Sequence, residues 1–426
     1  MAGTSVKLTV GTGTSATVER CQICDFDKLE NILFLGYLPP VNKMSNIGDF
    51  PKEQPSYPAL LLNCPRCQLV QLGLIVDPQV LFPPEYPYTS GTTKVLRDNF
   101  VELYQECRQL IPLDKKDLIV DIGSNDGTLL SNFVQNHRVQ GITPEEIGNL
   151  ARQRGIPTLI SYFNRQAVQD VLQNQGQAKI ITATNVFAHI EHIHEVVENV
   201  LDLLSEDGVF ISESHYLFDL LETLQYDTIY HEHLRYYSVH SLKYLLEKHG
   251  LEIFHVKSIP SHGGSIRVYA AHRGKYPTQE SVQNFLKAEA RKIEEGNQFH
   301  NFKEKVVHAK LALLALLLEI KERGKKIVGI GAPSRASTLI NYIGIDDGIL
   351  DCVFEIKGSY KIGKYIPGTL IPVQEESELY RDQPDYAILL SWHIAEELAP
   401  KIKQKGFKGD FIIPLPKPMI LYNAKI

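Results

Sequence analysis

The chain has 426 residues, of which 43% are hydrophobic and 22% are charged, and its formal net charge is −6. This composition is that of a soluble protein of two or three domains, and the slight negative charge gives no electrostatic basis for binding nucleic acid or an anionic membrane. No apolar run is long enough to span a bilayer, and the first twenty residues lack a secretory signal pattern, so we expect a cytoplasmic protein.

Four of the six cysteines form two C-x-x-C pairs, Cys21 with Cys24 and Cys64 with Cys67. In a cytoplasmic chain such pairs indicate a metal rather than disulfides, and four thiolates suit tetrahedral zinc. A closed four-cysteine site offers no open position for catalysis. We therefore expect a structural zinc ion that holds a small N-terminal domain, residues 1–75, together. The segment between the pairs is apolar rather than basic, which argues against a nucleic-acid-binding knuckle.

A loop rich in proline and small residues follows at 81–94 and contains Tyr86 and Tyr88. The next segment, 95–111, has the apolar periodicity of an amphipathic helix. The two tyrosines either pack within their loop or line a pocket that the loop covers.

The segment DLIVDIGSNDGTLL, residues 117–130, predicts a buried strand, a glycine-rich turn and a helix. Gly123 permits the tight turn and Gly127 a close approach, and the order D-x-G-x-x-x-G indicates a turn that binds S-adenosylmethionine. Further strands are predicted at 139–144, 179–190 and 208–214. This alternation of strands and helices is expected of a doubly wound sheet, which we assign to a central domain over residues 76–277.

Two positions near the ends of these strands bear on ligand binding. An acid commonly ends the second strand and binds the ribose hydroxyls, but here the residue is Thr143, with Glu145 and Glu146 just beyond. His189 lies at the end of the strand predicted at 179–190, with Asn185 close to it, on the side where such folds bind ligands. A surface histidine and a turn asparagine are the alternatives.

The segment YDTIYHEHLRYYSVHSL, residues 226–242, concentrates groups that transfer protons. Tyr230, His231, Glu232 and His233 are consecutive. Histidine titrates near neutrality, a buried glutamate can be raised toward it, and tyrosine can donate to a developing oxyanion. The alternative is a polar and aromatic surface loop. We favour an active site.

A second glycine turn follows at 258–274, where His262, Gly263 and Gly264 precede a strand that carries Arg267. We expect Arg267 to point out of that strand and the turn either to offer N–H groups to a phosphate or to be an ordinary hairpin. Residues 278–323 then read as two long helices that bridge to a third unit.

That third unit, within residues 278–426, opens with KKIVGIGAPSRASTLINYIG, again a strand, a glycine turn and a helix. Ser334 and Arg335 stand at the helix start, where an anion would bind. Further strands are predicted at 349–356 and 385–391, and Trp392 and His393 end the second of them. The expected fold is therefore α/β, with a small zinc domain before two Rossmann-like domains.

Taken together, these motifs resemble the deoxysugar C-methyltransferases, in particular the NDP-hexose C-3-methyltransferases. The resemblance covers nearly the whole chain in order: the paired C-x-x-C knuckles, Y-x-Y-T-S-G, DIGSNDG, NVFAHI, YDTIYHEH, HGGSIR, GAPSRASTLIN and YKIGKYIPGTLIP. YHEH together with HGGS is highly specific, whereas DIGSNDG alone would not be.

The resemblance implies S-adenosylmethionine and structural zinc as cofactors, and a role for each matching residue. Zinc would be bound by Cys21, Cys24, Cys64 and Cys67. S-adenosylmethionine would be bound by Asp121, Gly123, Ser124, Asn125, Asp126, Gly127 and Asn185. His233 would be the base, with Glu232, Tyr230, His189 and one of Tyr86 or Tyr88 around the sugar. The nucleotide-sugar would be held by His262, Gly263, Arg267, Ser334, Arg335, Lys361 and Trp392.

The sequence departs from the family pattern at three positions: Thr143 replaces the usual acid, Glu355 stands where aspartate is usual, and His393 where asparagine is common. The first bears on the strength of cofactor binding, and the other two on the nucleotide or sugar that is bound.

The resulting hypothesis is C-methylation of a 4-keto nucleotide-linked deoxysugar at C3. A sugar carbon becomes nucleophilic next to a ketone, because removal of its proton, here by His233, gives an enolate. Glu232 would orient that imidazole, and a tyrosine or histidine would donate to the enolate oxygen. Alternatives are methylation at C5, an epimerase that uses the same base, and a nucleotide-sugar binding protein without turnover. We expect a monomer, because no long unpaired apolar helix requires a dimer.

Overall fold

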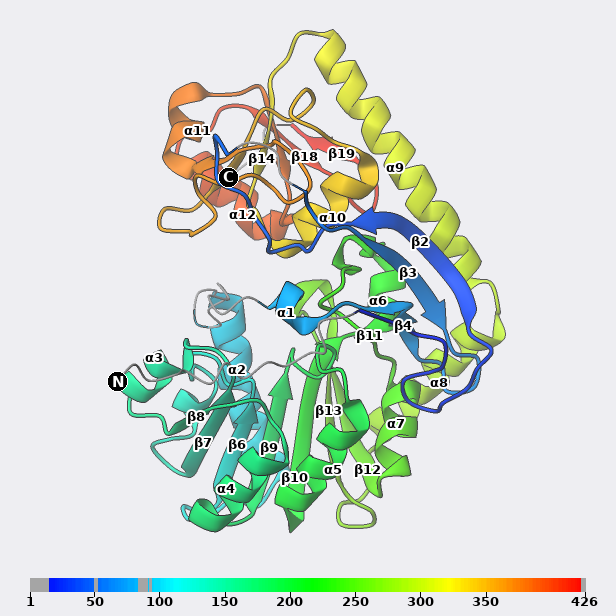
Figure 1. The fold of residues 1–426 in the computed structure, drawn as a ribbon, viewed down its shortest axis with the longest axis vertical. Coiled ribbons are helices and arrows are strands. Elements are labelled where there is room, and N and C mark those ends of the chain that lie inside the picture. The colour runs from blue at the N-terminus through cyan, green and yellow to red at the C-terminus, as the bar shows by residue number, and fades with distance from the viewer. Residues whose placement is uncertain (1–14, 50–52, 83–90, 92–93, 423–426) are drawn as a thin grey trace.

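The computed structural model describes residues 15–49, 53–82, 91 and 94–422. Figure 1 shows three main sheets. The central sheet lies at the bottom of the view, the C-terminal sheet at the top and the N-terminal sheet between them. The long helix α9 (Gln298–Glu322) runs along the outer side of the N-terminal sheet.

The central sheet has seven strands in the order β12-β13-β10-β9-β6-β7-β8. Their bounds are β6 Leu118–Ile122, β7 Arg138–Thr143, β8 Thr158–Ile160, β9 Ala178–Thr184, β10 Leu204–His215, β12 Leu251–Ile259 and β13 Ser265–His272. Strands β6 to β10 are parallel, and β13 is antiparallel to both of its neighbours. The strand order reverses between β6 and β9, and open α/β sheets bind ligands beyond the carboxyl ends of the strands at such a point.

Helices cover both faces of this sheet, so its middle strands are apolar on both sides. Their bounds are α1 Pro78–Leu81, α2 Lys94–Leu110, α3 Gly148–Gln153, α4 Arg165–Gln175, α5 Ile193–Leu203, α6 Leu217–Glu222 and α7 Val239–Lys248. Short 3-10 helices are η2 Leu130–Asn132, η3 Tyr226–Thr228 and η4 Ser261–Gly263. Along β6, Leu118 and Val120 face the core that α4 and α5 share, whereas Ile119 faces the core under α2.

The prediction of a helix after the glycine turn of β6 is wrong. Residues 124–137 form turns, with only η2 in a helical conformation. Two side chains explain this difference, because the Ser131 hydroxyl donates to the Thr128 carbonyl at 2.7 Å, and the Asn132 amide donates to the carbonyls of Thr128 and Leu129. Such local bonds compete with a helical ladder. The strand predicted at 179–190 ends at Thr184, where Asn185 adopts a positive φ of 56°.

The N-terminal sheet has the order β11-β4-β3-β2, and a separate two-stranded sheet pairs β1 with β5. The bounds are β1 Ala16–Thr17, β2 Glu30–Leu38, β3 Tyr57–Asn63, β4 Val70–Leu72, β5 Leu74–Ile75 and β11 Arg235–Tyr236. Strand β11 belongs to the YHEH segment: Arg235 pairs with Gln71 and Tyr236 with Val70. The sheet that follows the cysteine knuckles is thus completed by residues adjacent to His233.

The C-terminal sheet is again doubly wound, with the order β16-β15-β14-β17-β18-β19 and all pairs parallel except β18 with β19. The strands are β14 Ile327–Ile330, β15 Val353–Glu355, β16 Val373–Glu375, β17 Tyr386–Leu389, β18 Asp410–Ile413 and β19 Met419–Leu421. The helices are α8 Glu280–Glu294, α9, α10 Ser334–Ile343, α11 Glu376–Asp382, η5 Trp392–Ile394 and α12 Ala395–Gln404. The prediction of an α/β chain with two Rossmann-like sheets is confirmed.

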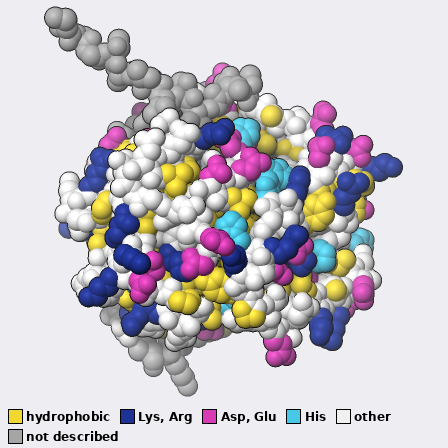
Figure 2. Space-filling model, turned by 90° about the horizontal axis from the view of Figure 1, so that it is seen from below, with side chains coloured by type: hydrophobic (Ala, Val, Ile, Leu, Met, Phe, Trp, Pro, Cys, Tyr) yellow, Lys and Arg dark blue, Asp and Glu magenta, His cyan; other side chains and the backbone are white. Residues whose placement is uncertain are grey.

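The surface agrees with the modest net charge. On the face drawn in Figure 2, acidic and basic side chains are interspersed, and the described residues form no continuous basic area there. Within the described ranges, no helix is both long and apolar enough to cross a membrane.

Candidate active site

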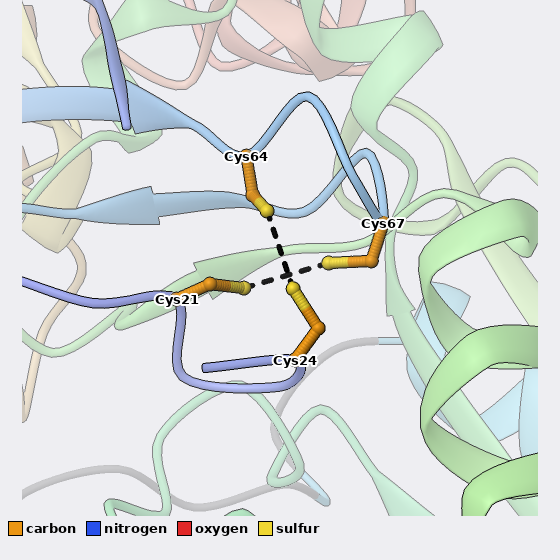
Figure 3. Close-up of side chains that lie close together, drawn as sticks. All are labelled: Cys21, Cys24, Cys64 and Cys67. Carbon is orange, nitrogen blue, oxygen red and sulfur yellow. Dashed lines mark hydrogen bonds between the residues drawn. The ribbon is translucent and has the colours of Figure 1, made fainter. Parts of the chain in front are cut away.

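The four predicted zinc ligands converge from two tight turns (Figure 3). All four are buried or nearly so, and their sulfur atoms lie within 4.8 Å of one another. The Sγ atoms of Cys21 and Cys67 are 3.4 Å apart, as are those of Cys24 and Cys64. A tetrahedral zinc–thiolate site with Zn–S bonds of about 2.3 Å has sulfur atoms about 3.8 Å apart, so the cluster fits zinc closely. With four ligands the site is closed, and its role is structural.

Polar groups gather where the carboxyl ends of β6 and β9 meet at the switch point, the expected cofactor site. Gly123 and Asn125 both adopt positive φ, at 71° and 50°, and the Cβ of any larger residue at Gly123 would lie 2.4 Å from Val186. The Ser124 hydroxyl and the Asn185 side-chain oxygen are buried without a hydrogen-bond partner. Buried polar atoms without partners are rare in proteins, so these two residues fit a polar ligand such as S-adenosylmethionine.

The two aspartates of DIGSND have different surroundings. Burial raises the pKa of Asp121 to about 7, and its carboxyl accepts a 2.6 Å hydrogen bond from Thr182. Asp126 has a fully buried side chain that accepts from the Thr128 hydroxyl, the Gly91 amide and Arg154. Asp126 was predicted as a cofactor ligand, but these contacts show a residue that holds the turn together. Gly127 packs closely on Ala151 and Ile156.

The substitution at the end of β7 is compensated locally. Thr143 is buried, and its hydroxyl donates to a carboxylate oxygen of Glu145 at 2.6 Å. Glu145 is half-buried. A carboxylate therefore stands close to where the family's acid would be, and we expect Glu145 to take its place at the ribose hydroxyls.

Four histidines form a cluster that includes His233 of the YHEH segment. The ring centroid of His233 lies 4.9 Å from that of His189, 5.1 Å from that of His215 and 4.2 Å from that of Tyr230. His262 joins through His215, with centroids 5.3 Å apart. The structure thus brings together His233, Tyr230, His189 and His262, and it adds His215, which the sequence analysis did not identify.

The tautomer of His233 follows from its hydrogen bond. Its Nδ1 lies 2.8 Å from the carbonyl oxygen of Thr228, which can only accept, so Nδ1 carries the proton and Nε2 keeps its lone pair. Burial, with smaller effects of His189 and other neighbours, holds the pKa of His233 well below its usual value. Burial also lowers the pKa of His189 and of His262 to about 4. The imidazoles are therefore neutral at neutral pH.

The Glu232 carboxylate is directed elsewhere. It accepts a 2.7 Å hydrogen bond from the Asn42 amide, whose oxygen accepts from the Ser334 hydroxyl at 3.2 Å. The orienting role predicted for Glu232 falls instead to the Thr228 carbonyl. Lys361, also predicted at the substrate, donates to the Ala332 carbonyl, and Glu355 accepts from the Ala332 amide at 2.8 Å. Glu232, Ser334 and Lys361 thus lie where the N-terminal, central and C-terminal parts meet.

Arg335 was predicted as an anion ligand, and in the structure the anion that it binds is the carboxylate of Asp227. Its guanidinium binds both carboxylate oxygens of Asp227, at 2.7 and 2.8 Å, and donates to Nδ1 of His393 at 3.0 Å. Trp392 donates to the same carboxylate at 2.7 Å. This buried pair joins the C-terminal unit to η3, whose last residue, Thr228, supplies the carbonyl that holds His233.

Arg267 does not point out of its strand, so that prediction is wrong. The side chain is fully buried and is paired with Glu213 and Glu106, each at 2.6 Å. Hydrogen bonds from His255, Tyr269 and Arg267 lower the pKa of Glu106 to about 2, although burial alone would raise it. Asn99 on α2 also binds Arg267 and Glu213. The network ties α2 to the sheet.

Several neighbours of the cluster were not recognised from sequence: His215, Asp227, Asn42 and Gln225. His215 ends β10, and its position beyond a predicted strand was the available signal. Gln225 holds the HGG turn, because its amide donates to the Gly263 carbonyl at 2.6 Å and a Cβ on Gly263 would lie 2.5 Å from its oxygen. Tyr86 and Tyr88 lie outside the described residues.

Three family models match the chain in order. Residues 21–82 match "Putative zinc binding domain", residues 95–256 match "Methyltransferase domain" and residues 260–416 match "C-methyltransferase C-terminal domain". Among solved structures, a SAM-dependent methyltransferase from Anabaena variabilis is 15% identical, with a TM-score of 0.35, over 44% of this chain and 88% of that one. The magnesium protoporphyrin IX methyltransferase of Synechocystis is 14% identical, with a TM-score of 0.33, over 41% and 82%.

A full-length relative decides the family. The C-methyltransferase NovU of Streptomyces niveus is 31% identical over 409 residues, which are 95% of this chain and 97% of the relative. This chain is therefore a member of the C-methyltransferase family, an enzyme that uses S-adenosylmethionine and carries a zinc-binding domain at its four cysteines.

Proposed function

We propose that the enzyme methylates C3 of a 4-keto nucleotide-linked deoxysugar, with His233 as the base. The observation that carries this proposal is the Thr228 carbonyl on Nδ1 of His233, which leaves Nε2 of a neutral imidazole free among the rings of Tyr230, His189 and His215. The family resemblance of YHEH and HGGS supports a keto-sugar as the substrate. Methylation of carbon requires that a carbon acid first lose a proton.

The residues divide the work as follows. Nε2 of His233 removes the proton on the carbon next to the ketone. The pKa of Tyr230 is raised well above its usual value by burial and the nearby Glu232, so the phenol keeps its proton and can donate to the enolate oxygen. The bound S-adenosylmethionine supplies an electrophilic methyl group to the enolate carbon. His189 lies on the loop that begins at Asn185, so the same segment carries a residue of the expected cofactor site and a residue of the histidine cluster.

At the other end of the substrate, the Asn42 amide and the Lys361 ammonium lie near Glu232 and each keep an N–H group for the nucleotide-sugar. Asn42, Glu232 and Lys361 belong to three different parts of the chain. Substrate binding therefore requires the N-terminal and C-terminal parts to be in place over the central sheet. Holding both reactants in one site excludes water and supplies a large part of the rate enhancement.

The test combines turnover with exchange. The enzyme is incubated in D₂O with a panel of 4-keto nucleoside-diphosphate deoxyhexoses, with and without S-adenosylmethionine, and the products are analysed by mass spectrometry and NMR. Without S-adenosylmethionine we expect deuterium in place of the C3 proton, and with it a methyl group in place of that proton. Deuterium exchange and methylation at C5 would show that the reaction takes place at that carbon instead. Exchange without any methyl transfer, or no turnover on the panel, would contradict the proposal.

The base is tested with His233→Asn. Loss of the general base should lower kcat by about 10²- to 10⁴-fold and abolish deuterium exchange, while calorimetry shows both ligands still binding. His300→Asn, on the exposed surface of α9, is the matched control and should keep wild-type turnover. Near-normal turnover of His233→Asn would reject the assignment of the base.

A further inference from the structure

Arg235 is a buried cation without an acidic partner. Its side chain is 2% exposed, and in the part of the chain that the structure describes no carboxylate forms an ion pair with it. Burying a charge without a counter-charge costs several kcal/mol. Its Nε is also buried without a hydrogen-bond partner. A residue in this state indicates that a negative charge is present at the site in the functional protein.

The zinc centre is the anion within reach. Arg235 pairs across the sheet with Gln71, whose side-chain oxygen accepts from the backbone amide of Gln22, between the two cysteines of the first knuckle. Burial lowers the pKa of Arg235, whereas Tyr237, then Cys21 and more weakly Glu191, raise it. A zinc ion bound by four thiolates carries a net charge of about −2. Lys248 also reaches the knuckle, at the Ile23 carbonyl, but it is half-exposed and so its charge is screened.

The rest of the guanidinium contacts the active-site loop. Nη1 donates to the Ile190 carbonyl at 2.6 Å and Nη2 to the Glu191 carbonyl at 2.5 Å, immediately after His189. The preceding residue, Leu234, donates its amide to the Ala188 carbonyl at 3.0 Å. Through its backbone pairing with Gln71 and its guanidinium contacts, Arg235 therefore connects the first cysteine knuckle to the His189 loop, and it lies two residues from His233.

We propose that Arg235 is the counter-ion of the zinc–tetrathiolate centre and the positioning residue through which that centre holds His189 and His233 in place. The arginine neutralises part of the charge of the buried thiolates, and the thiolates in turn keep the guanidinium oriented toward the two carbonyls. The link to catalysis rests on the proposed function, whereas the link to zinc does not.

The experiment measures zinc affinity by competition with a chromogenic chelator on the intact, zinc-loaded protein, with metal content checked by mass spectrometry. Outer-shell partners of metal ligands typically contribute about 10- to 100-fold to affinity. Arg235→Met should therefore weaken zinc binding at least about tenfold. Arg235→Lys keeps the charge and should stay within about threefold of wild type, although it loses the paired carbonyl contacts.

Arg66→Met is the matched control. Arg66 adjoins Cys67 in sequence, but it is exposed and lies over the Phe26 ring, so its removal should leave zinc affinity unchanged. If Arg235→Met does not fold, Arg235→Gln replaces it. Wild-type zinc affinity in the neutral variant would overturn the proposal, and so would equal weakening in Arg235→Lys, or failure of all three variants to fold.

Turnover is measured in the same variants. We expect kcat to fall in Arg235→Lys even though zinc is retained, because the carbonyls of Ile190 and Glu191 lose their bidentate partner. Wild-type kcat in this variant would reject the positioning role. If no substrate of the panel is turned over even by the wild type, the proposed function fails, but the zinc measurement still decides the counter-ion role.

Discussion

At the scale of single residues, the feature that sets this site apart is a group of neutral histidines in a buried place. A histidine whose folded pKa lies below its unfolded value of about 6.5 takes up a proton more readily in the unfolded chain. For His189 and His262, with folded pKa values of about 4, this difference has no effect on stability above pH 6.5. As the pH falls from 6.5 to 4, the unfolded chain binds protons that the folded chain does not, and the free energy of unfolding decreases progressively.

We therefore predict a loss of stability on mild acidification. Each of these histidines should contribute a slope of about 1.4 kcal/mol per pH unit in this window. Urea unfolding at a series of pH values, with zinc in excess, measures it. His262→Gln should reduce the slope by the contribution of one histidine, whereas substitution of the exposed His300 by Gln should leave it unchanged. A slope unchanged by His262→Gln would mean that His262 is charged in the folded protein.

Residue identities were the part of the site most open to prediction. Short motifs in the sequence were enough to predict His233, Tyr230, His189 and the cysteines as site residues, because their side chains have a distinctive chemistry. Arg267 and Arg335 could not be judged in this way, since a buried ion pair depends on carboxylates far away in sequence, Glu213 and Asp227. Nor could the partner of Glu232 be inferred, because Asn42 lies 190 residues away.

At the scale of elements, the short helix η3 connects the C-terminal unit to the catalytic base. Arg335, on α10, binds Asp227 within η3, and the next residue, Thr228, holds Nδ1 of His233. Both side chains of the ion pair are almost fully buried. Removing one partner of such a pair leaves an uncompensated charge, which typically costs about 3–5 kcal/mol.

We predict that Arg335→Met destabilises the protein by about 3 kcal/mol and lowers kcat more than it raises KM, because the Thr228 carbonyl shifts away from His233. The double variant with Asp227→Asn should lose less than the sum of the single losses. Arg381→Met, which breaks an exposed ion pair in the same unit, is the control and should leave stability and kcat nearly unchanged. Additive losses would show that the two residues do not act as a pair, and an unchanged kcat would show that the pair does not position His233.

Helix α2, which has strong periodicity, was predicted within one residue of its observed bounds, because burial of one face determines it. The segment after Gly127 was predicted wrongly as a helix, because Ser131 and Asn132 donate to backbone carbonyls that a helix would have used. Strand β11 was also missed. Two residues carry no periodicity, and this strand exists only because β4 offers an edge to pair with.

At the scale of the whole molecule, the zinc centre and the expected cofactor site belong to different sheets. S-adenosylmethionine is expected at the ends of β6 and β9, which pair only with strands of the central sheet, although the hydrophobic core is continuous with that of the N-terminal sheet. The catalytic segment, in contrast, pairs directly with β4, three residues after Cys67.

We predict that removal of zinc separates binding from catalysis. Protein stripped by a strong chelator should bind S-adenosylmethionine within about twofold of the native affinity, measured by calorimetry, yet lose at least about 90% of its turnover, and zinc should restore it. Equal loss of both would show that the central sheet depends on the metal. Full turnover without zinc would show that the cysteine cluster does not support the active site.

The pairing of β4 with β11 also bears on how the chain reaches its native state. Val70–Leu72 is buried on one edge of the N-terminal sheet, and its partner is synthesised only much later, at residues 235–236. Until then, the ribosome-bound segment exposes an apolar edge strand, which is a template for pairing with other chains. The cysteine segment expressed by itself would meet the same difficulty, and the enzyme should be produced and dissected as a single folding unit.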